Sequence, residues 1–269
     1  MKKQERIFTT EGLPPALTEL YLGSNRVGAG AAALAGARLA VLDLFGNDVG
    51  DDAVAAFGAT EVIARLFLGG NPVSTPMEDL GVLTSLRLDH TDIGDAGVAR
   101  LAAALRRKAC CLRELVLSGT RCGPKGAAVI AEALGSCGLT SLNLSLTAVG
   151  DKGVYAIAPR LQGSQLRDLQ LAGCGVSDGG AHALAEALRS GKPPLRSLNL
   201  SGGNCYSESG ARALLVALHA NAAVTDLVLS PAAVGPEVLA ELRELLGPGA
   251  RASRGRADPS DSWAGVPWW

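Results

Sequence analysis

The leucine spacing of this chain limits it to an array of similar units stacked along one axis. One pattern, Leu-x-x-Leu-x-Leu-x-x-(Asn/Thr/Cys)-x-(Val/Ile/Cys)-Gly, recurs nine times. Its copies begin at Leu17, Leu39, Ile63, Leu83, Leu112, Leu139, Leu166, Leu195 and Val224. Repeats spaced by 20 to 29 residues are typical of solenoids, in which each unit is stable only when it packs against its neighbours.

Within each copy, the Leu-x-Leu pair predicts a short β-strand whose leucines face the core while the residues beside them face the other way. The polar residue three positions after the last leucine suits a tight turn, where a small side chain bonds to main-chain groups. This ladder position is filled by Asn25, Asn47, Asn71, Thr91, Thr120, Thr147, Cys174 and, after a one-residue insertion at 202–203, Asn204. We expect the ladder residues to hold the turn of each unit.

Nine copies in register resemble leucine-rich-repeat proteins over residues 17–247. From the fourth copy on, the second half of the unit reads Gly-Asp-x-Gly-(apolar)…Ala-x-Ala-Leu, as in residues 94–105, which is similar to the ribonuclease-inhibitor subclass. The resemblance implies an α/β leucine-rich-repeat solenoid, or horseshoe, with a parallel concave β-sheet, convex helices and about nine repeats. The first copies are too short for a full helix, whereas the later ones fit one, as the helical spacing of Val98, Leu101 and Leu105 indicates.

The chain is expected to divide into three parts. Residues 1–16 form an N-terminal cap or arm, residues 17–247 the solenoid, and residues 248–269 an extended C-terminal tail. The amphipathic segment 237–246 predicts a helix that caps the last repeat. The tail holds no Leu or Ile, so we expect it not to extend the repeats.

Composition and charge exclude several classes of protein. Twenty-five basic and 26 acidic side chains give a net charge of −1, so no global field attracts nucleic acid or an anionic membrane. The chain shows no apolar run after its first residues that reads as a secretory signal, and Arg38 and Asp43 interrupt its longest weakly polar stretch. We therefore expect an intracellular, cytoplasmic protein without a membrane span.

The cysteines and histidines give no sign of a metal, cofactor or catalytic site. The six cysteines lack CxxC spacing and read as free thiols, with Cys122 and Cys205 at positions where other repeats carry valine. A redox or metal pair at Cys110–Cys111 is the weaker alternative. The GxGxxA run at 28–33 resembles a dinucleotide-binding turn, but its first glycine belongs to the repeat pattern. His90, His182 and His219 lie in different repeats, so no metal or triad site is predicted.

The outward residues of the strands are the default contact surface of a solenoid. Aromatic and charged side chains gather in the first four units, whereas later strands present mainly Ser, Asn, Gln and small residues. Because aromatic residues and arginine dominate interface hot spots, we predict a partner-binding patch there. It comprises Tyr21, Phe45, Phe67, Arg65, Arg87, Asp89 and His90. The alternative is that these aromatic residues only cover a flat, short-repeat sheet or pack locally.

A second partner-binding segment is predicted in the tail. All three tryptophans, Trp263, Trp268 and Trp269, lie in the final seven residues. Exposed tryptophan is unusual in a solubilising tail, so this segment fits a linear docking motif or a strap that folds back onto the solenoid.

Taken together, these features predict a non-enzymatic protein-protein interaction module or scaffold, a subunit of a larger intracellular assembly. We expect protein partners and no nucleic acid or small-molecule substrate. The alternative is a GTPase-activating regulator, since activators of the Ran GTPase resemble this repeat subclass. The chain lacks their acidic tail, and neither Arg26 nor Arg65 matches their functional motif. A pattern-sensing role is a third interpretation, without a fused signalling domain to support it.

Overall fold

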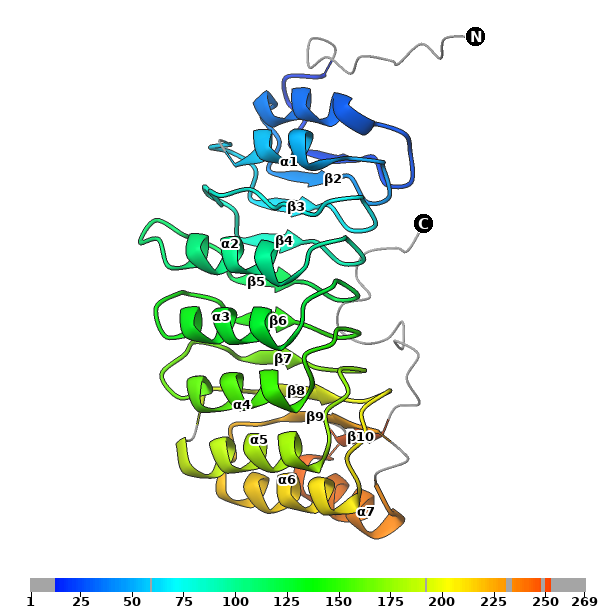
Figure 1. Cartoon of the computed structure of the whole chain (residues 1–269), viewed down its shortest axis with the longest axis vertical. Helices are drawn as coiled ribbons and strands as arrows, with labels where there is room; N and C mark the ends of the chain where they lie inside the picture. Colours follow the sequence, from blue (N-terminus) through cyan, green and yellow to red (C-terminus); the bar gives the residue numbers. More distant parts are fainter. Residues whose placement is uncertain (1–12, 59, 192, 231–233, 248–249, 253–269) are drawn as a thin grey trace.

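Each leucine pattern forms one short strand, and the strands stack in sequence order. The structure is a computed structural model, and it describes residues 13–58, 60–191, 193–230, 234–247 and 250–252. The strands are β1 (Glu19–Tyr21), β2 (Val41–Asp43), β3 (Arg65–Phe67), β4 (Ser85–Arg87), β5 (Glu114–Val116), β6 (Ser141–Asn143), β7 (Asp168–Gln170), β8 (Ser197–Leu200), β9 (Asp226–Leu229) and β10 (Ala250–Ala252). They make one parallel sheet in which each strand pairs with the next (Figure 1).

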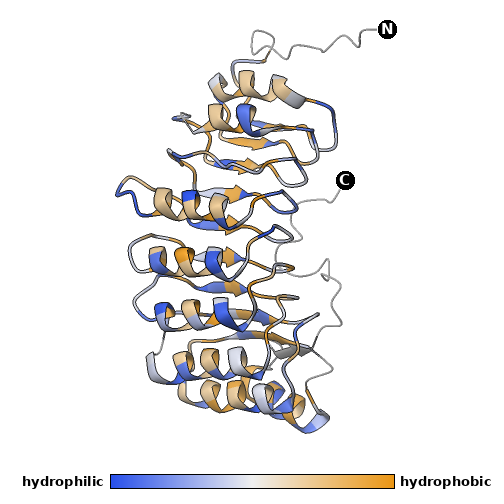
Figure 2. Cartoon of the chain, viewed as in Figure 1, coloured by the Kyte–Doolittle hydropathy of each residue, from blue (hydrophilic) through white to orange (hydrophobic). Residues whose placement is uncertain are grey.

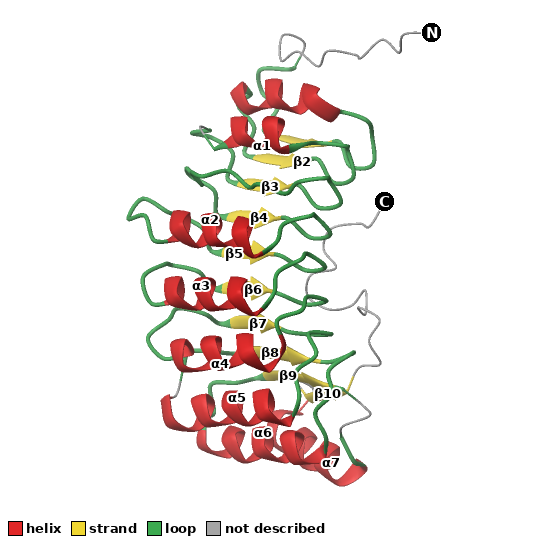
Figure 3. Cartoon of the chain, viewed as in Figure 1, coloured by secondary structure: helices red, strands yellow, loops and turns green. Residues whose placement is uncertain are grey.

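The connections between the first four strands are shorter than those between β4 and β9, as the repeat intervals predict. The connections between strands hold η2 (Gly28–Gly36), α1 (Asp51–Phe57), α2 (Asp95–Leu105), α3 (Pro124–Leu134), α4 (Gly150–Leu161), α5 (Asp178–Gly191), α6 (Glu208–Ala220) and α7 (Pro236–Leu246). The first is a 3₁₀-helix and the second has only 7 residues, whereas the helices from α2 on have 11 to 14 residues. The later helices stack one above another in a column that runs alongside the stack of strands (Figure 3). The sheet and its helical column confirm the predicted solenoid.

The core lies between the sheet and the helices. The middle leucines of the strands, such as Leu66, Leu115 and Leu142, have no exposed surface, and neither do Val98 and Leu101 of α2. The apolar colouring continues from unit to unit along the whole stack (Figure 2). Burying one such leucine contributes roughly 1.5–3 kcal/mol, so the repeat itself supplies most of the stability.

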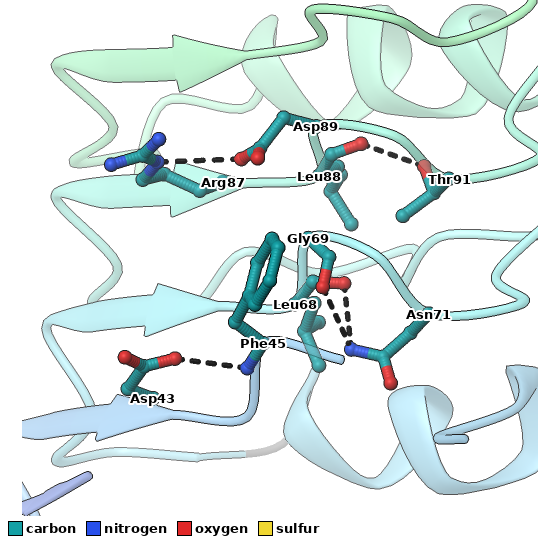
Figure 4. A network of polar contacts seen from close by, with 9 residues as sticks. All are labelled: Asp43, Phe45, Leu68, Gly69, Asn71, Arg87, Leu88, Asp89 and Thr91. Carbon is teal, nitrogen blue, oxygen red and sulfur yellow. Dashed lines mark hydrogen bonds and ion pairs between the residues drawn. The ribbon is translucent and has the colours of Figure 1, made fainter. Parts of the chain in front are cut away.

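The ladder asparagines join neighbouring units as well as holding their own turns. Oδ1 of Asn71 accepts the main-chain N–H groups of Asn47 (2.8 Å) and Val49 (3.0 Å) in the preceding unit. Its Nδ2 donates to the carbonyl oxygen of Leu44 in that unit (2.8 Å) and to two carbonyls of its own turn (Figure 4). Asn71 is 3% exposed, so these bonds satisfy a buried amide.

Two of the three ladder threonines bond only within the turn of their own unit. The hydroxyl groups of Thr91 and Thr120 each donate to the carbonyl three residues earlier, at 2.7 Å. Neither of these hydroxyls bonds to the preceding unit, as the asparagine amides do. Asn204 restores these bonds further along, because its Oδ1 accepts the N–H of Cys174 (3.0 Å) and its Nδ2 donates to the carbonyl of Leu171 (2.9 Å).

Two expectations are wrong. The sheet continues into the segment that we assigned to the tail, because β10 pairs in parallel with β9. Cys205 is exposed, and Tyr206 takes the buried valine position with 4% of its surface exposed. The extra residue at 202–203 moves the pattern forward by one position, which brings Tyr206 inward. The wider division into cap, solenoid and tail stays a prediction, because residues 1–12 and 253–269 lie outside the described residues.

Candidate functional site

The face of the sheet turned away from the helices, called the concave face below, carries rows of side chains that cross the strands in register. One row consists of Tyr21, Asp43, Phe67, Arg87, Val116, Asn143, Gln170, Asn199 and Val228. A second row, two residues earlier in each strand, consists of Glu19, Val41, Arg65, Ser85, Glu114, Ser141, Asp168, Ser197 and Asp226. Side chains from distant parts of the sequence thus become neighbours.

Four of the predicted residues form one cluster at β3 and β4. The guanidinium carbon of Arg65 lies 5.5 Å from the ring centroid of Phe67, and that of Arg87 lies 5.8 Å from it. Each such contact contributes about 0.5–1 kcal/mol at an exposed site and more when it is shielded from water. Nε of Arg87 also donates to Oδ1 of Asp89 at 3.3 Å (Figure 4). We call Arg65, Phe67, Arg87 and Asp89 the arginine cluster.

The arginine cluster presents charge rather than an aromatic surface. Phe67 is 6% exposed and Asp89 is 4% exposed, whereas Arg65 is exposed. Phe67 therefore serves as a packing platform that holds the guanidinium groups, and Asp89 holds one of them from the side. The sequence placed these four residues on the same face, but it did not reveal that the aromatic ring is covered.

The remaining three predicted residues lie outside the arginine cluster, on β1, in the loop after β2 and in the turn after β4. Tyr21 is 55% exposed, and its hydroxyl donates to a carboxylate oxygen of Glu19 at 2.9 Å. That hydrogen bond, with partial burial, raises the pKa of Tyr21. The main-chain N–H of Phe45 donates to Oδ1 of Asp43 at 2.9 Å, and its half-buried ring rises from the loop after β2 (Figure 4). His90 is exposed and adopts a positive φ of 54°.

The turn position that holds His90 in the fourth unit carries another bulky residue in the sixth, one that the sequence patterns did not single out. Leu146 occupies the equivalent position two repeats later, with a φ of 58° and 59% of its surface exposed. Other units place glycine there, such as Gly119 and Gly173, both with positive φ. The sequence signal for Leu146 is a leucine at a position where other repeats carry glycine. Its side chain leans over Gly173, where an added Cβ would meet Cδ2 of Leu146 at 2.9 Å.

The second row, which precedes the strand leucines, contributes only Arg65 to the predicted patch. In its later half, carboxylates from β5, β7 and β9 alternate with serines from β6 and β8. The pKa of Asp168 in this row is raised, first by burial and then by the neighbouring charges of Asp226 and Glu114. The predicted patch is confined to the first four units, so it does not include these carboxylates of the later strands.

The described residues offer no cluster of three or more His, Cys, Asp or Glu side chains suited to a metal ion. All six cysteines are free, and burial raises the pKa of the Cys122 thiol to about 12. His182 and His219 contact carbonyl groups of their own helices.

In the part of the chain that the structure describes, no helix has both the length and the apolar character needed to cross a bilayer. Trp263, Trp268 and Trp269 lie outside the described residues.

The repeat and the fold of this chain are similar to those of known proteins. The family described as Leucine Rich repeat matches residues 39–58, 82–102, 135–158 and 165–185. No curated protein matches the chain. The structure is similar to an internalin from Listeria monocytogenes, with a TM-score of 0.53 and 18% identity over 90% of this chain and 68% of the other. It is also similar to TLR13 in a TLR13–ssRNA13 complex, with a TM-score of 0.52 and 16% identity over 89% of this chain and 40% of the other. With the repeated strands in a single parallel sheet, these matches identify the chain as a leucine-rich-repeat solenoid.

Proposed function

We propose that the chain is a non-enzymatic protein-protein interaction module, acting as a scaffold subunit in a larger intracellular assembly. Solenoids of this kind commonly bind proteins on their extended inner surface. The observation that carries the proposal is the arginine cluster, in which Phe67 and Asp89 hold two guanidinium groups on the concave face. We further propose that the later repeats belong to the ribonuclease-inhibitor-like subclass, because each carries a helix between its strands.

The geometry of the cluster suits binding because its side chains are already fixed. A long arginine side chain normally loses rotamer freedom when it binds a partner, and stacking on Phe67 reduces that loss. Arginine and tyrosine are also enriched among the residues that contribute most to interfaces. Tyr21 stands two strands from Phe67 in the same row, so an incoming protein surface meets an exposed phenol and a held guanidinium together.

The direct test is a double variant, Tyr21→Ala with Arg65→Ala. The full chain serves as bait in affinity purification followed by mass spectrometry, and the dissociation constant of the purified partner is then measured. We expect affinity to fall tenfold or more, because two hot-spot side chains are removed. The matched control is Tyr155→Ala with Arg160→Ala, an exposed tyrosine and arginine on α4.

Two results would contradict the proposal. One is an unchanged affinity in the concave variant, and the other is an equal loss in the α4 control. Acceleration of GTP hydrolysis by purified small GTPases would instead favour the regulator alternative, which requires an arginine that reaches the nucleotide.

The tryptophan segment is proposed as a second contact, on the strength of its sequence alone. Deletion of residues 258–269 is expected to weaken partner recovery while the thermal unfolding of the repeats stays the same. Unchanged recovery would show that Trp263, Trp268 and Trp269 take no part in assembly.

A further inference from the structure

A row of alternating carboxylates and hydroxyls crosses the later half of the concave face. Its members, Glu114, Ser141, Asp168, Ser197 and Asp226, come from five consecutive strands, β5 to β9, and are paired in register. We call them the acidic row. All five are partly exposed, so the row is open to a ligand.

Two carboxylates of the acidic row carry charge that no ion pair among the described residues balances. Within the described part of the chain, Glu114 and Asp168 belong to none of the ion pairs. The arginine that precedes Glu114, Arg113, directs its guanidinium to the carbonyl oxygen of Gly138 at 2.9 Å, in the loop before β6. The raised pKa of Asp168 has mutual repulsion within the row among its causes. A bound cation would relieve this repulsion.

Two hydroxyl groups beside Glu114 give an independent sign of a missing ligand. Ser85 on β4 and Ser141 on β6 are the register partners of Glu114 on either side. The Oγ atoms of both are shielded from solvent and have no hydrogen-bond partner among the described residues, and Ser85 is only 5% exposed. Shielded polar atoms without partners are rare in folded proteins, and a bound group is one way to satisfy them. An ammonium or guanidinium group bound at Glu114 has several N–H donors and reaches a carboxylate and an adjacent hydroxyl together.

The distance between the carboxylates determines which backbone conformation of a bound peptide fits the acidic row. Adjacent strands lie about 4.8 Å apart, so carboxylates on alternate strands are about 9.6 Å apart. A polyproline II segment repeats every three residues, or about 9.3 Å, and presents every third side chain on one face. Same-face residues of a β-strand are about 6.7 Å apart, and two turns of an α-helix span about 10.8 Å, so both fit less well.

We propose that the acidic row binds an extended protein segment in the polyproline II conformation that carries Lys or Arg at every third position. The proposal shares with the function above only the assumption of a protein partner, because its residues are separate from Tyr21 and the arginine cluster. The basic side chains pair with Glu114, Asp168 and Asp226, and the hydroxyls between them accept the remaining N–H groups.

Two labelled peptides of identical composition test the proposal. The first, Lys-Pro-Pro-Lys-Pro-Pro-Lys, spaces its charges as the row requires, and the second, Pro-Pro-Lys-Lys-Lys-Pro-Pro, clusters them. Binding to the full chain is measured by fluorescence anisotropy at low salt, where charge interactions are least screened. We expect the spaced peptide to bind about tenfold more tightly than the clustered one, a difference of about 1.4 kcal/mol.

Substitutions test whether the spaced peptide binds at the acidic row. The acidic-row variant combines Glu114→Gln, Asp168→Asn and Asp226→Asn and is expected to abolish binding. The control, with the same loss of charge on the exposed faces of the helices, combines Glu132→Gln, Glu186→Gln and Glu241→Gln and is expected to retain it. Ser141→Ala alone is expected to weaken binding severalfold without lowering the thermal stability, which keeps the test informative if the triple variant does not fold.

The results separate this proposal from the one above. The Tyr21→Ala/Arg65→Ala variant is expected to bind the spaced peptide normally, so either surface can fail alone. No binding by the wild type, equal affinity for the two peptides, or an equal loss in the helix-face control would overturn the acidic-row proposal.

Discussion

The carboxylate of Asp95, in the first turn of α2, lies 2.9 Å from the main-chain nitrogen of Gly126 at the start of α3. The same oxygen also accepts the N–H of Gly123 at 2.6 Å. Helix starts leave main-chain N–H groups without partners, and here the preceding repeat supplies the acceptor. Gly126 is required because a Cβ at that position would come within 2.7 Å of the oxygen. The Gly-Asp-x-Gly motif thus joins one repeat to the next.

The Asp95→Ala variant should lower the free energy of unfolding by about 1–3 kcal/mol, because two N–H groups at the start of α3 lose their acceptor. Chemical denaturation followed by circular dichroism measures this change. Asp92→Ala is the control, since the exposed ion pair of Asp92 with Arg121 contributes at most about 1 kcal/mol. Equal effects of the two substitutions would refute the role assigned to Asp95.

Asp168→Asn should raise the stability at neutral pH. The pKa of Asp168 is raised in the folded state, so the folded protein binds the proton more tightly than the unfolded chain, and the charged form is unfavourable above that pKa. The advantage of the variant is therefore complete above the folded-state pKa and disappears as the pH falls below about 3.9, the ordinary value. Thermal unfolding of both proteins across this range measures it. An advantage that grows in acid would contradict the repulsion described for the acidic row.

Tyr206→Phe should destabilise the eighth repeat. The hydroxyl of Tyr206 donates to the carbonyl of Leu200 (3.0 Å) and accepts the N–H of Ser230 (2.7 Å), and burial raises its pKa to about 12. Removing it leaves both main-chain groups without this partner, at a cost of about 1–3 kcal/mol in unfolding free energy. Tyr155→Phe, at an exposed tyrosine, should be neutral. A neutral Tyr206→Phe would mean that these two bonds contribute nothing.

Leu146→Gly should stabilise the chain even though it deletes a side chain. Leu146 holds a left-handed backbone conformation that costs a side-chain-bearing residue about 1–2 kcal/mol and costs glycine almost nothing. Leu146→Ala is the matched control, because it removes the exposed leucine but keeps the Cβ that causes the strain. We expect a higher unfolding midpoint for the glycine variant only. The same rise in both would show that the exposed leucine, rather than the backbone, is unfavourable.

The sequence predicts most of the fold because the residues of each repeat determine the structure of that repeat. The spacing of the leucines determines the strand positions, and the interval between copies determines whether a helix fits. β10 could not be predicted in this way, since its Ala-Arg-Ala sequence contains no apolar signal and it joins the sheet through main-chain pairing with β9. Tyr206 was misplaced because one inserted residue shifted the register.

The candidate sites were less predictable because they depend on neighbouring strands. Whether Phe67 is open or covered depends on Arg65 beside it and on Arg87, 20 residues later. Likewise, Glu114, Asp168 and Asp226 are unremarkable individually and become a row only when the strands align. Short-range patterns indicate which residues face outward, whereas the pairing of strands decides what they contact.

The asparagine ladder implies that the solenoid responds unevenly to mechanical force. Asn47 and Asn71 tie the first three units together through buried amides, so they should yield to a pull on the N-terminal end as one piece. The first rupture is expected between the third and fourth units, where Thr91 bonds within its own turn. A partner that pulls on the early repeats would therefore move the first three units together as one rigid body.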